Sequence, residues 1–327
     1  MRIAIVGATG LVGRTMISVL EKSALPIKEL VLAASAKSAG KEIEFQGNSL
    51  SVTTVEKCLE SKVDVALFSA GGAVSQQYAP LFVEKGAWVI DNSSYWRMNQ
   101  EVPLVVPEIN FNLKNQSRLI ANPNCSTIQL VMALFPLQKH YGLKRVVVST
   151  YQSVSGTGVV ALEQMEAERR GETTVQSPYP HPIDMNCLPH CGSFLENAYT
   201  TEEMKLVLET RKILNLPNLA ITTTNVRVPV RVGHSEAVNV ELNEPFNLSD
   251  IIHFYKEMAG VMVEDEPKTN LYPLPITAEG KNEVFIGRLR RDESVDNGLN
   301  MWVVSDNLRK GAATNAVQIV ERLFNVK

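Results

Sequence analysis

The chain has 327 residues and a formal net charge of −3, with 45% hydrophobic and 20% charged residues. This length suggests about two domains, and the small net charge gives no electrostatic case for binding nucleic acid or an anionic membrane. No apolar run reaches the roughly 18 residues of a membrane helix, and four cysteines in a chain this long do not indicate a disulfide scaffold. We therefore expect a globular, cytoplasmic protein.

The first part of the chain alternates short apolar runs with helical patterns. The run RIAIV at residues 2–6 has the length of a buried strand, and residues 11–22 after it carry apolar side chains at helical spacing. Further strands are expected at 29–35, 63–70 and 87–94, with a helix at 73–86. Strands that alternate with helices predict an α/β, Rossmann-type fold with a doubly wound parallel sheet.

The pattern changes after about residue 125, where long runs rich in Val and Thr predict strands and two helical patterns intervene. The expected strands are 144–156, 219–231, 235–242, 283–292 and 299–307, and the expected helices are 158–171 and 201–214. We predict a second, α+β domain with a largely antiparallel or mixed sheet. The predicted first domain is 1–124 with a C-terminal helix at 308–327, and the second is 125–307.

The sequence GATGLVG follows the first predicted strand directly and contains Gly7, Gly10 and Gly13. In a dinucleotide site, the first glycine permits the tight turn, the second permits close approach of a pyrophosphate, and the third permits close packing of helix on strand. The N–H groups at the helix start then face the phosphates. The motif predicts a nucleotide cofactor, with a tight turn that binds no ligand as the alternative.

The residues after the second predicted strand indicate which dinucleotide is bound. A site for NAD has an acidic residue about 20 residues after the glycine turn, whereas AASAKSAG, residues 33–40, contains none. It offers the hydroxyls of Ser35 and Ser38 and the cation of Lys37, which can hold a 2′-phosphate. We predict NADP rather than NAD, and a solvated polar turn is the alternative.

Cys125 lies between the turn-forming Asn122-Pro123-Asn124 and the apolar run STIQLVMALFPL. The run predicts a helix, and a helix N-terminus stabilises a thiolate, the nucleophilic form of cysteine. The local sequence leaves two interpretations open, a nucleophile and a buried structural cysteine. A nucleophile needs a proton-transfer partner, and His234, where one strand run ends and another begins, is the best candidate among the five histidines.

Several motifs together resemble one family. GATGLVG, NPNCST, YQSVSGTG, EEMK and RVPVRVGHSE occur here in the order that they have in aspartate-β-semialdehyde dehydrogenases. The resemblance runs from the first strand to the last helix and includes FSAGG, VIDNSSYWR, VPLVVPEIN and SDNLRKGAA. Five motifs in order are far more specific than any one of them.

The resemblance implies an NADP-dependent oxidoreductase that converts L-4-aspartyl phosphate to L-aspartate 4-semialdehyde, in the biosynthesis of lysine, threonine, methionine and diaminopimelate. The family reaction passes through a cysteine thioester and thiohemiacetal, with NADPH as the reductant. By resemblance, Cys125 is the nucleophile, His234 is the acid/base group with a pKa near neutrality, and Gln152 orients the intermediate. Asn124 and nearby backbone N–H groups would stabilise the oxyanion.

The substrate carries a carboxylate, an amine and a phosphate, and the resemblance implies a residue for each. Arg227 is the carboxylate fork, Glu202 meets the amine, and both Lys205 and Arg97 meet the phosphate. Without the family match, the spacing of Glu202 and Lys205 indicates a solvated i,i+3 ion pair. Arg97 would then be expected to be a surface arginine.

The spacing of Arg227 and His234 is difficult to reconcile with a single strand. They are seven residues apart, and an odd spacing places two side chains on opposite faces of a strand. A bend or bulge must intervene if both serve one site. Arg231, four residues after Arg227, remains the alternative carboxylate fork.

The resemblance also implies the cofactor contacts and the assembly. The implied partners are small molecules (aspartyl phosphate, aspartate semialdehyde and phosphate), with no nucleic acid, membrane or metal. Family members pair through the second domain, which implies a homodimer, with a homotetramer as the alternative. The implied contacts with NADP are Gly7, Thr9, Gly10, Leu11, Val12, Gly13, Ser35, Ser38, Ser69, Gly71, Ser155, Gly156 and Asn307.

Two other dehydrogenases and one class without catalytic activity are the alternatives to this function. N-acetyl-γ-glutamyl-phosphate and glyceraldehyde-3-phosphate dehydrogenases share the thioester chemistry and the general architecture. The latter would have SCTTN at the cysteine, and the set of Glu202, Lys205 and Arg227 argues against both. A catalytically silent relative with a structural role would lack the cysteine or the histidine, and both are present here.

Cys187 and Cys191 lie near His181 and His190 and suggest a metal site at first sight. Their C-x3-C spacing in a proline-rich loop matches zinc sites poorly, and the family that the chain resembles needs no metal. We expect both cysteines to be small buried residues.

Overall fold

The computed structural model describes residues 1–112, 117–172 and 177–326. The chain divides into two units: unit 1 comprises Met1–Asn124 with Ala312–Lys327, and unit 2 comprises Cys125–Gly311. Residues 308–311 therefore fall in unit 2, whereas the sequence analysis assigned them to the first domain. Among the described residues, none of the helices combines the length and hydropathy that a membrane crossing requires.

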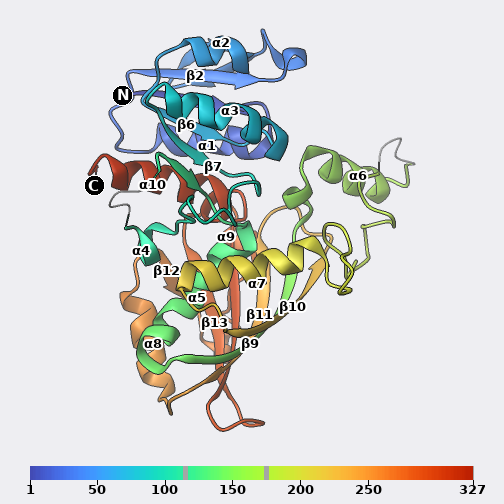
Figure 1. Ribbon diagram of the computed structural model, residues 1–327. Coiled ribbons are helices and arrows are strands. Elements are labelled where there is room, and N and C mark those ends of the chain that lie inside the picture. Colours follow the sequence, from blue (N-terminus) through green and yellow to red (C-terminus); the bar gives the residue numbers. More distant parts are fainter. Residues whose placement is uncertain (113–116, 173–176, 327) are drawn as a thin grey trace. The chain divides into compact units, whose positions relative to one another are not determined.

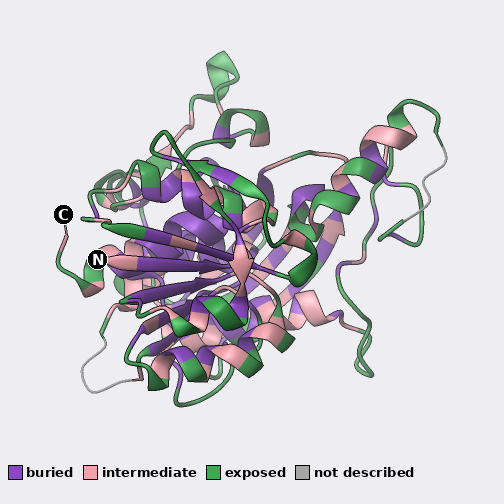
Figure 2. Ribbon diagram, turned by 90° about the horizontal axis from the view of Figure 1, so that it is seen from above, coloured by how far each residue is buried: buried purple, intermediate pink, exposed green. Residues whose placement is uncertain are grey.

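Unit 1 is built on a six-stranded sheet with the strand order β5-β2-β1-β6-β7-β8. All neighbouring strands run parallel, which confirms the predicted doubly wound parallel sheet. The central strands are buried on both faces (Figure 2), so their sequences are continuous apolar runs. The strands are β1 (Arg2–Val6), β2 (Glu29–Ala34), β5 (Thr53–Thr54), β6 (Val65–Phe68), β7 (Trp88–Asp91) and β8 (Leu119–Ala121).

Helices and one small hairpin complete unit 1. Helix α1 follows the glycine turn and buries Met16 and Leu20 against the sheet core, as its helical spacing predicts. The helices are α1 (Leu11–Glu21), α2 (Val55–Glu60), α3 (Gly72–Glu84), α4 (Pro107–Asn110) and α10 (Thr314–Leu323), with a 3₁₀ turn at Ala36–Ser38. The hairpin is β3 (Glu42–Phe45) and β4 (Asn48–Ser51).

The end of the chain differs from the single helix predicted at 308–327. A π-helical segment, Arg309–Ala313, precedes α10, which ends at Leu323, and Lys327 lies outside the described residues. The π-helical segment brings Gly311 against the start of α5 in unit 2, where a Cβ on Gly311 would lie 2.9 Å from the Cβ of Cys125. Short π-helical segments of this kind are frequent at functional sites.

Unit 2 contains a six-stranded mixed sheet with the order β10-β9-β11-β14-β13-β12. The β10–β9 and β12–β13 pairs are parallel and the other three pairs are antiparallel, so the prediction of a largely antiparallel or mixed sheet is confirmed. The strands are β9 (Leu143–Gln152), β10 (Ala220–Arg227), β11 (His234–Leu242), β12 (Val261–Val263), β13 (Val284–Asp292) and β14 (Gly298–Ser305).

Helix α5 is the central helix of unit 2. It contacts four strands of the sheet and also α7 and α8, and Figure 1 shows α5 and α7 along the same sheet. Most of its residues are therefore buried, including the polar Gln129. The helices of unit 2 are α5 (Cys125–Tyr141), α6 (Val159–Arg169), α7 (Thr201–Leu214), α8 (Leu248–Glu257) and α9 (Pro275–Ala278), with 3₁₀ turns at Val154–Thr157 and Pro267–Thr269.

The start of α7 is fixed by a capping box. The Thr200 hydroxyl accepts from the Glu203 N–H at 3.2 Å, and the Glu203 carboxylate accepts from the Thr200 N–H at 2.6 Å. The other oxygen of Glu203 accepts from the Asn225 N–H on β10 at 3.1 Å. Because these bonds tie the first turn of α7 to β10, they fix the position of Glu202 in unit 2.

Candidate active site

Three strands of unit 2 bring Gln152, Arg227 and His234 to one edge of the sheet. Strand β10 runs parallel to β9 and pairs Arg227 with Gln152, the last residue of each strand. Strand β11 runs antiparallel to β9 on its other side and starts at His234, with Ser235 opposite Tyr151. The odd spacing of Arg227 and His234 thus needs no bulge, because they belong to two different strands that flank β9.

Cys125 is the first residue of α5 and is partly exposed. The side-chain nitrogen of Gln152 donates to the hydroxyl of the next residue, Ser126, at 3.1 Å. This bond joins the start of α5 to the end of β9. The structure therefore brings together, within unit 2, the predicted nucleophile and the residue expected to orient its intermediate.

His234 is fully buried, and its two ring nitrogens have different surroundings. Nδ1 accepts from the backbone N–H of Ser153 at 3.0 Å and also lies 3.0 Å from the Ser153 hydroxyl. Because a backbone N–H can only donate, Nδ1 carries the lone pair and Nε2 carries the proton of the neutral ring. Nε2 has no hydrogen-bond partner in the described part of the chain, and a Cβ on Gly156 would lie 3.2 Å from it.

Burial and, to a smaller extent, the nearby Arg227 guanidinium together lower the pKa of His234 to about 3, while Glu202 acts in the opposite direction. The pKa near neutrality that the family resemblance implied is not found, because the ring has no solvent contact. His234 is therefore a neutral imidazole at pH 7, able to donate a hydrogen bond from Nε2.

Arg227 lies beside His234 and is also buried. Its Nη1 donates to the Ser153 carbonyl at 2.7 Å, whereas Nε has no hydrogen-bond partner among the described residues. Its guanidinium carbon is 5.9 Å from the centre of the Tyr179 ring. A buried guanidinium with an unused N–H group can bind a carboxylate.

Glu202 and Lys205 form the i,i+3 ion pair on α7 that the spacing predicts, with 2.8 Å between Nζ and Oε2. The carboxylate is largely buried and raises the pKa of His234, so its field reaches the imidazole. The pair therefore belongs to the same part of unit 2 as Arg227.

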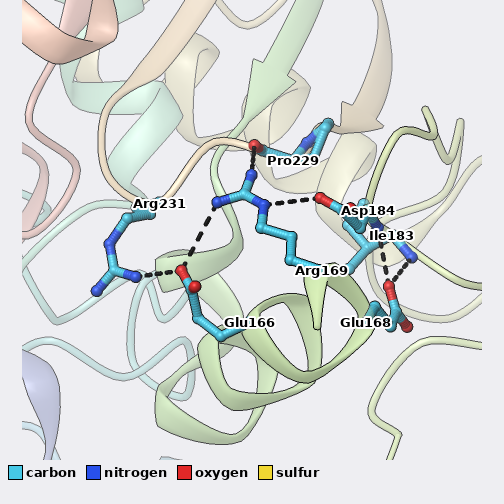
Figure 3. Close-up of polar contacts among 7 residues, drawn as sticks. All are labelled: Glu166, Glu168, Arg169, Ile183, Asp184, Pro229 and Arg231. Carbon is cyan, nitrogen blue, oxygen red and sulfur yellow. Dashed lines mark hydrogen bonds and ion pairs between the residues drawn. The ribbon is translucent and has the colours of Figure 1, made fainter. Parts of the chain in front are cut away.

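Arg231, the alternative carboxylate fork, points away from this group. Its Nη1 donates to the Glu166 carboxylate on α6, and 57% of its side chain is exposed. Figure 3 shows Glu166 between Arg231 and Arg169. Nε of Arg169 also donates to the Asp184 carboxylate at 2.7 Å. Arg231 thus helps to attach the β10–β11 connection to α6.

Arg97 and Asn124 lie in unit 1, and both are buried. Arg97 donates through Nε to the carbonyl of Asn122 and through Nη2 to that of Asn92, both at 2.9 Å. It is not the surface arginine that would be expected without the family match, because these bonds fix its guanidinium beside the Asn-Pro-Asn turn.

The glycine turn of unit 1 opens onto a cavity of ≈ 540 Å³. A Cβ at Gly7 would lie 2.7 Å from the backbone of Ser69, and one at Gly13 would lie 2.2 Å from the Gly7 carbonyl oxygen, so both must be glycine. The lining residues are Gly7, Thr9, Gly10, Ala34, Ser35, Ala36, Val55, Glu56, Ser69, Ala70, Val74, Gln77 and Tyr78. Size, shape and the start of α1 fit a dinucleotide.

Other predicted cofactor residues of unit 1 lie in the first turn of α1, just before α3, and in the 3₁₀ turn after β2. Leu11, Val12 and Gly13 form the first turn of α1, and Gly71 precedes α3 with φ 87°. Ser38 ends the 3₁₀ turn and is not among the lining residues, because the turn after Ser35 carries it away.

The remaining predicted cofactor residues, Ser155, Gly156 and Asn307, surround His234 in unit 2. Oδ1 of Asn307 accepts from the Gly233 N–H at 2.9 Å and from the hydroxyls of Ser153 and Ser155 at 3.0 and 3.2 Å. These bonds tie the turn after β9 to the residue that precedes His234.

Sequence reasoning missed Glu56 and Tyr78 in the cavity. The Tyr78 hydroxyl donates to the Glu56 carboxylate, which lowers the pKa of that carboxyl. Glu56 lies on α2 and Tyr78 on α3, and no local motif links them. Only the packing of both helices beside the end of β2 could have identified them.

None of the four cysteines forms a disulfide within the part of the chain that the structure describes. Cys191 is buried, as expected, and burial raises the pKa of its thiol to about 11. The expectation for Cys187 was wrong, since its loop leaves this side chain exposed. In the described residues, no group of three or more His, Cys, Asp or Glu side chains could hold a metal ion.

Both units match known protein families. Residues 2–116 match the family described as "Semialdehyde dehydrogenase, NAD binding domain", and residues 134–310 match "Semialdehyde dehydrogenase, dimerisation domain". The two matches cover most of the chain and agree with its two units. Fold and sequence therefore define an oxidoreductase of the semialdehyde dehydrogenase class.

Individual relatives narrow the class. An aspartate-semialdehyde dehydrogenase of Aquifex aeolicus is 50% identical over 98% of this chain and 97% of its own. The crystal structure of aspartate semialdehyde dehydrogenase II complexed with ASA from Vibrio cholerae has a TM-score of 0.94 and 43% identity, covering 99% of this chain and 98% of that one. A structure of the Candida albicans enzyme with NADP has a TM-score of 0.76 and 25% identity, covering 100% and 99%. The chain belongs to the aspartate-semialdehyde dehydrogenase family, which confirms the resemblance.

Proposed function

We propose that this protein interconverts L-4-aspartyl phosphate and L-aspartate 4-semialdehyde with NADP, through a covalent intermediate on Cys125. The observation that carries the proposal is the meeting of Gln152, Arg227 and His234 at one sheet edge, beside the helix that starts at Cys125. A nucleophile at a helix start and an imidazole N–H that no described residue accepts suit acyl transfer to a cysteine, and a guanidinium N–H that is likewise unused among these residues suits a substrate carboxylate.

In the biosynthetic direction, the Cys125 thiolate attacks the acyl carbon of aspartyl phosphate. The C–S bond forms, the C–O bond to phosphate breaks, and phosphate leaves with the bonding electron pair. NADPH, held at the glycine turn of unit 1, would supply the hydride that reduces the thioester carbon. The carbonyl then re-forms, and Cys125 leaves as a thiolate, so the cycle needs no net proton transfer to sulfur.

His234 acts in this scheme mainly as a hydrogen-bond donor. The Nε2–H of its neutral ring has no acceptor among the described residues, and a Cβ on Gly156 would lie 3.2 Å from Nε2. A substrate oxygen that gains negative charge during hydride transfer would accept this bond. The side chain of Gln152, held by Ser126, is a second neutral group for orienting the same carbonyl.

The polar groups of the substrate match the charges around this edge. We assign the α-carboxylate to Arg227, whose Nε has no partner in the described chain, and the amine to Glu202, which is largely buried. We assign the phosphate to Lys205 and Arg97, and assign Asn124 to the oxyanion. Arg231 has no place in this scheme, because it bonds Glu166.

A steady-state assay with aspartate semialdehyde, phosphate and either NADP or NAD tests the function. We expect phosphate-dependent reduction of NADP, with NAD a much poorer substrate. If neither cofactor is reduced while the protein is folded, the proposed activity is wrong. If NAD is reduced faster than NADP, only the proposed cofactor preference is wrong.

The preference for NADP rests on Ser35, which lines the cavity at the end of β2 and can donate to a 2′-phosphate. Among the described residues that line the cavity, the acid is Glu56, and it is hydrogen-bonded to Tyr78. A relative solved with NADP supports the same assignment.

The Ser35→Asp variant should lose NADP affinity, because a second negative charge beside a 2′-phosphate costs more than 1.4 kcal/mol, or at least about tenfold in KM. The KM for NAD should change little. Ser38→Asp is the matched control, since Ser38 does not line the cavity, and its KM for NADP should stay within about twofold of the wild type. Equal effects of the two substitutions would contradict the placement of the 2′-phosphate at Ser35.

We also propose that the protein is a homodimer that associates through unit 2. The family description of residues 134–310 as a dimerisation domain supports this assembly. Light scattering should give twice the chain mass of 36.1 kDa, and a monomer mass at assay concentrations would contradict it.

A further inference from the structure

Glu236 is a buried acid for which the proposed chemistry has no role. It lies on β11, two residues after His234, and its side chain therefore points to the same face of the strand. It is 0% exposed, and neither carboxyl oxygen has a hydrogen-bond partner among the described residues. Buried carboxyl groups are usually paired, so this one needs an explanation.

The neighbours of Glu236 contain further unpaired polar groups. In the sheet, Glu236 stands opposite Thr150 on β9 and Val303 on β14, and Gln129 of α5 is the polar side chain that acts on its carboxyl. The Thr150 hydroxyl and the Gln129 side-chain nitrogen are fully buried and also lack partners in the described chain. We call Gln129, Thr150, Glu236 and Ser305 the Glu236 layer.

The Glu236 layer lies directly behind the proposed catalytic residues. Gln129 is one helical turn after Cys125 on α5. Its side-chain oxygen accepts from the Ser305 hydroxyl at 2.6 Å, and Ser305 stands opposite His234 in the sheet. The layer therefore connects the first turn of the nucleophile's helix to the start of the histidine's strand.

The surroundings of Glu236 favour its neutral form. Burial raises the pKa of Glu236 well above its usual value, and only Gln129 acts in the opposite direction. The titratable groups nearest to it along these elements are Cys125 on α5 and His234 on β11, and Arg227 and Glu202 act on the imidazole. The other titratable groups of these elements lie at their far ends, or on the opposite face of β9 in the case of Tyr151: Lys139, His140 and Tyr141 on α5, Lys144 and Arg145 on β9, and Glu241 on β11. The facing residues of β9 and β14 are Thr150 and Val303, neither of which can offset a carboxylate charge.

We propose that Glu236 is a proton-bearing positioning residue for the Cys125–His234 pair. A neutral acid can donate one hydrogen bond and accept another, and the Thr150 hydroxyl and the Gln129 side-chain nitrogen, which lack partners among the described residues, are the groups that would complete them and hold the start of α5 against β11. Its second function is electrostatic. A carboxylate about 7 Å along the strand from His234 would favour the imidazolium, whereas the neutral acid leaves the ring uncharged. The inference rests on the proposed function for the roles of Cys125 and His234.

Glu236→Gln is the discriminating variant, because it keeps the shape and the hydrogen bonds but cannot ionise. We expect its kcat, its pH–rate profile and its rate of Cys125 alkylation by iodoacetamide to stay within about twofold of the wild type. Glu236→Leu removes the hydrogen bonds, and we expect it to lower kcat by about 10- to 100-fold with KM nearly unchanged, since a misplaced nucleophile slows chemistry more than binding. Glu241→Gln is the control, because it removes a partly exposed acid of the same strand, β11, that is paired with Lys144 on β9.

Infrared spectroscopy reads the protonation state directly and needs no activity. The wild type at pH 7 should show the carbonyl stretch of a protonated carboxylic acid, and Glu236→Gln should lack it. Absence of this band from the wild type, or a shifted pH–rate profile in Glu236→Gln, would overturn the neutral acid. Wild-type kcat in a folded Glu236→Leu would overturn the positioning role.

The same measurements separate this inference from the proposed function. If the wild type has no activity with aspartate semialdehyde, the proposed function fails, but the infrared band and the alkylation rates still test Glu236. If Glu236→Leu does not fold, Glu236→Gln decides the matter: wild-type kcat and alkylation rate support the neutral hydrogen-bonding role, and loss of either contradicts it.

Discussion

Replacing Cys125 with alanine is expected to lower kcat for phosphate-dependent NADP reduction by at least about 10³-fold, because no other group can carry the acyl chain. Cys125→Ser should be almost as inactive, since a hydroxyl is a far weaker nucleophile than a thiolate at neutral pH. Both variants should remain folded, because the thiol is partly exposed and its removal leaves no large cavity. Initial rates give kcat, and circular dichroism shows whether each variant is folded.

Cys187→Ala is the matched control for this experiment. It removes an exposed thiol from the same unit, and we expect activity within about twofold of the wild type. A covalent test accompanies it: aspartyl phosphate or aspartate semialdehyde with NADP should leave an acyl group on the wild-type chain when phosphate is absent. Substantial turnover by Cys125→Ala would show that the acyl group is not carried on this cysteine.

The sheet of unit 1 could be predicted from sequence because its strands are buried on both faces. Burial on both faces makes a strand such as RIAIV a continuous apolar run, and the glycine turn after it is a local motif. The cavity beside it was harder to predict. Glu56 reaches it from α2 and Tyr78 from α3, and local patterns do not state which helices pack beside the end of β2.

The candidate site shows a different limit. The sequence contains all the residue types that the site needs. If Arg227 and His234 were on one strand, however, their odd spacing would place them on opposite faces. The strand order β10-β9-β11 removes the conflict, since six residues after Arg227 carry the chain across β9. Strand order is a long-range property that hydrophobic periodicity does not contain.

The burial of Glu236 could have been predicted from the sequence of β11. In HSEAVNVEL, the even positions 238, 240 and 242 are apolar and form the buried face of β11, so the same alternation places Glu236 in the core. An acid in the register of a buried face conflicts with the local pattern. Such conflicts are expected at functional or strained sites.

The sequence also could not predict the charge state of His234. Its usual pKa is 6.5, and the value of about 3 comes from complete burial and from Arg227. RVPVRVGHSE contains Arg227, but it shows neither the burial of the ring nor the position of Arg227 beside it. His234 could thus be proposed from the sequence, whereas its protonation depends on the tertiary structure.

His234→Ala is expected to lower kcat by about 10²- to 10³-fold, the usual effect of removing one donor to a developing oxyanion. His234→Gln places an amide N–H near the position of Nε2, and we expect it to recover at least about tenfold of that loss. Wild-type kcat should show no acidic limb from a histidine between about pH 5 and 8, because the ring is already neutral there. If His234→Gln is as inactive as His234→Ala and the wild type has a limb near pH 6.5, His234 transfers a proton instead.

The same buried ring makes stability depend on pH with a definite sign. The folded-state pKa of His234 is lowered from 6.5 to about 3, so between these values the unfolded chain binds one more proton than the folded chain. This contribution to stability is complete above pH 6.5 and is lost as the pH falls, at up to about 1.4 kcal/mol per pH unit. His234→Gln cannot titrate, so its free energy of unfolding should fall less steeply over this range in denaturant titrations. Glu236 has the opposite sign, because its raised pKa favours the folded state at low pH, and Glu236→Gln should lose stability less steeply as the pH rises. Parallel curves for wild type and His234→Gln between pH 4 and 6 would mean that the imidazole is not neutralised by burial.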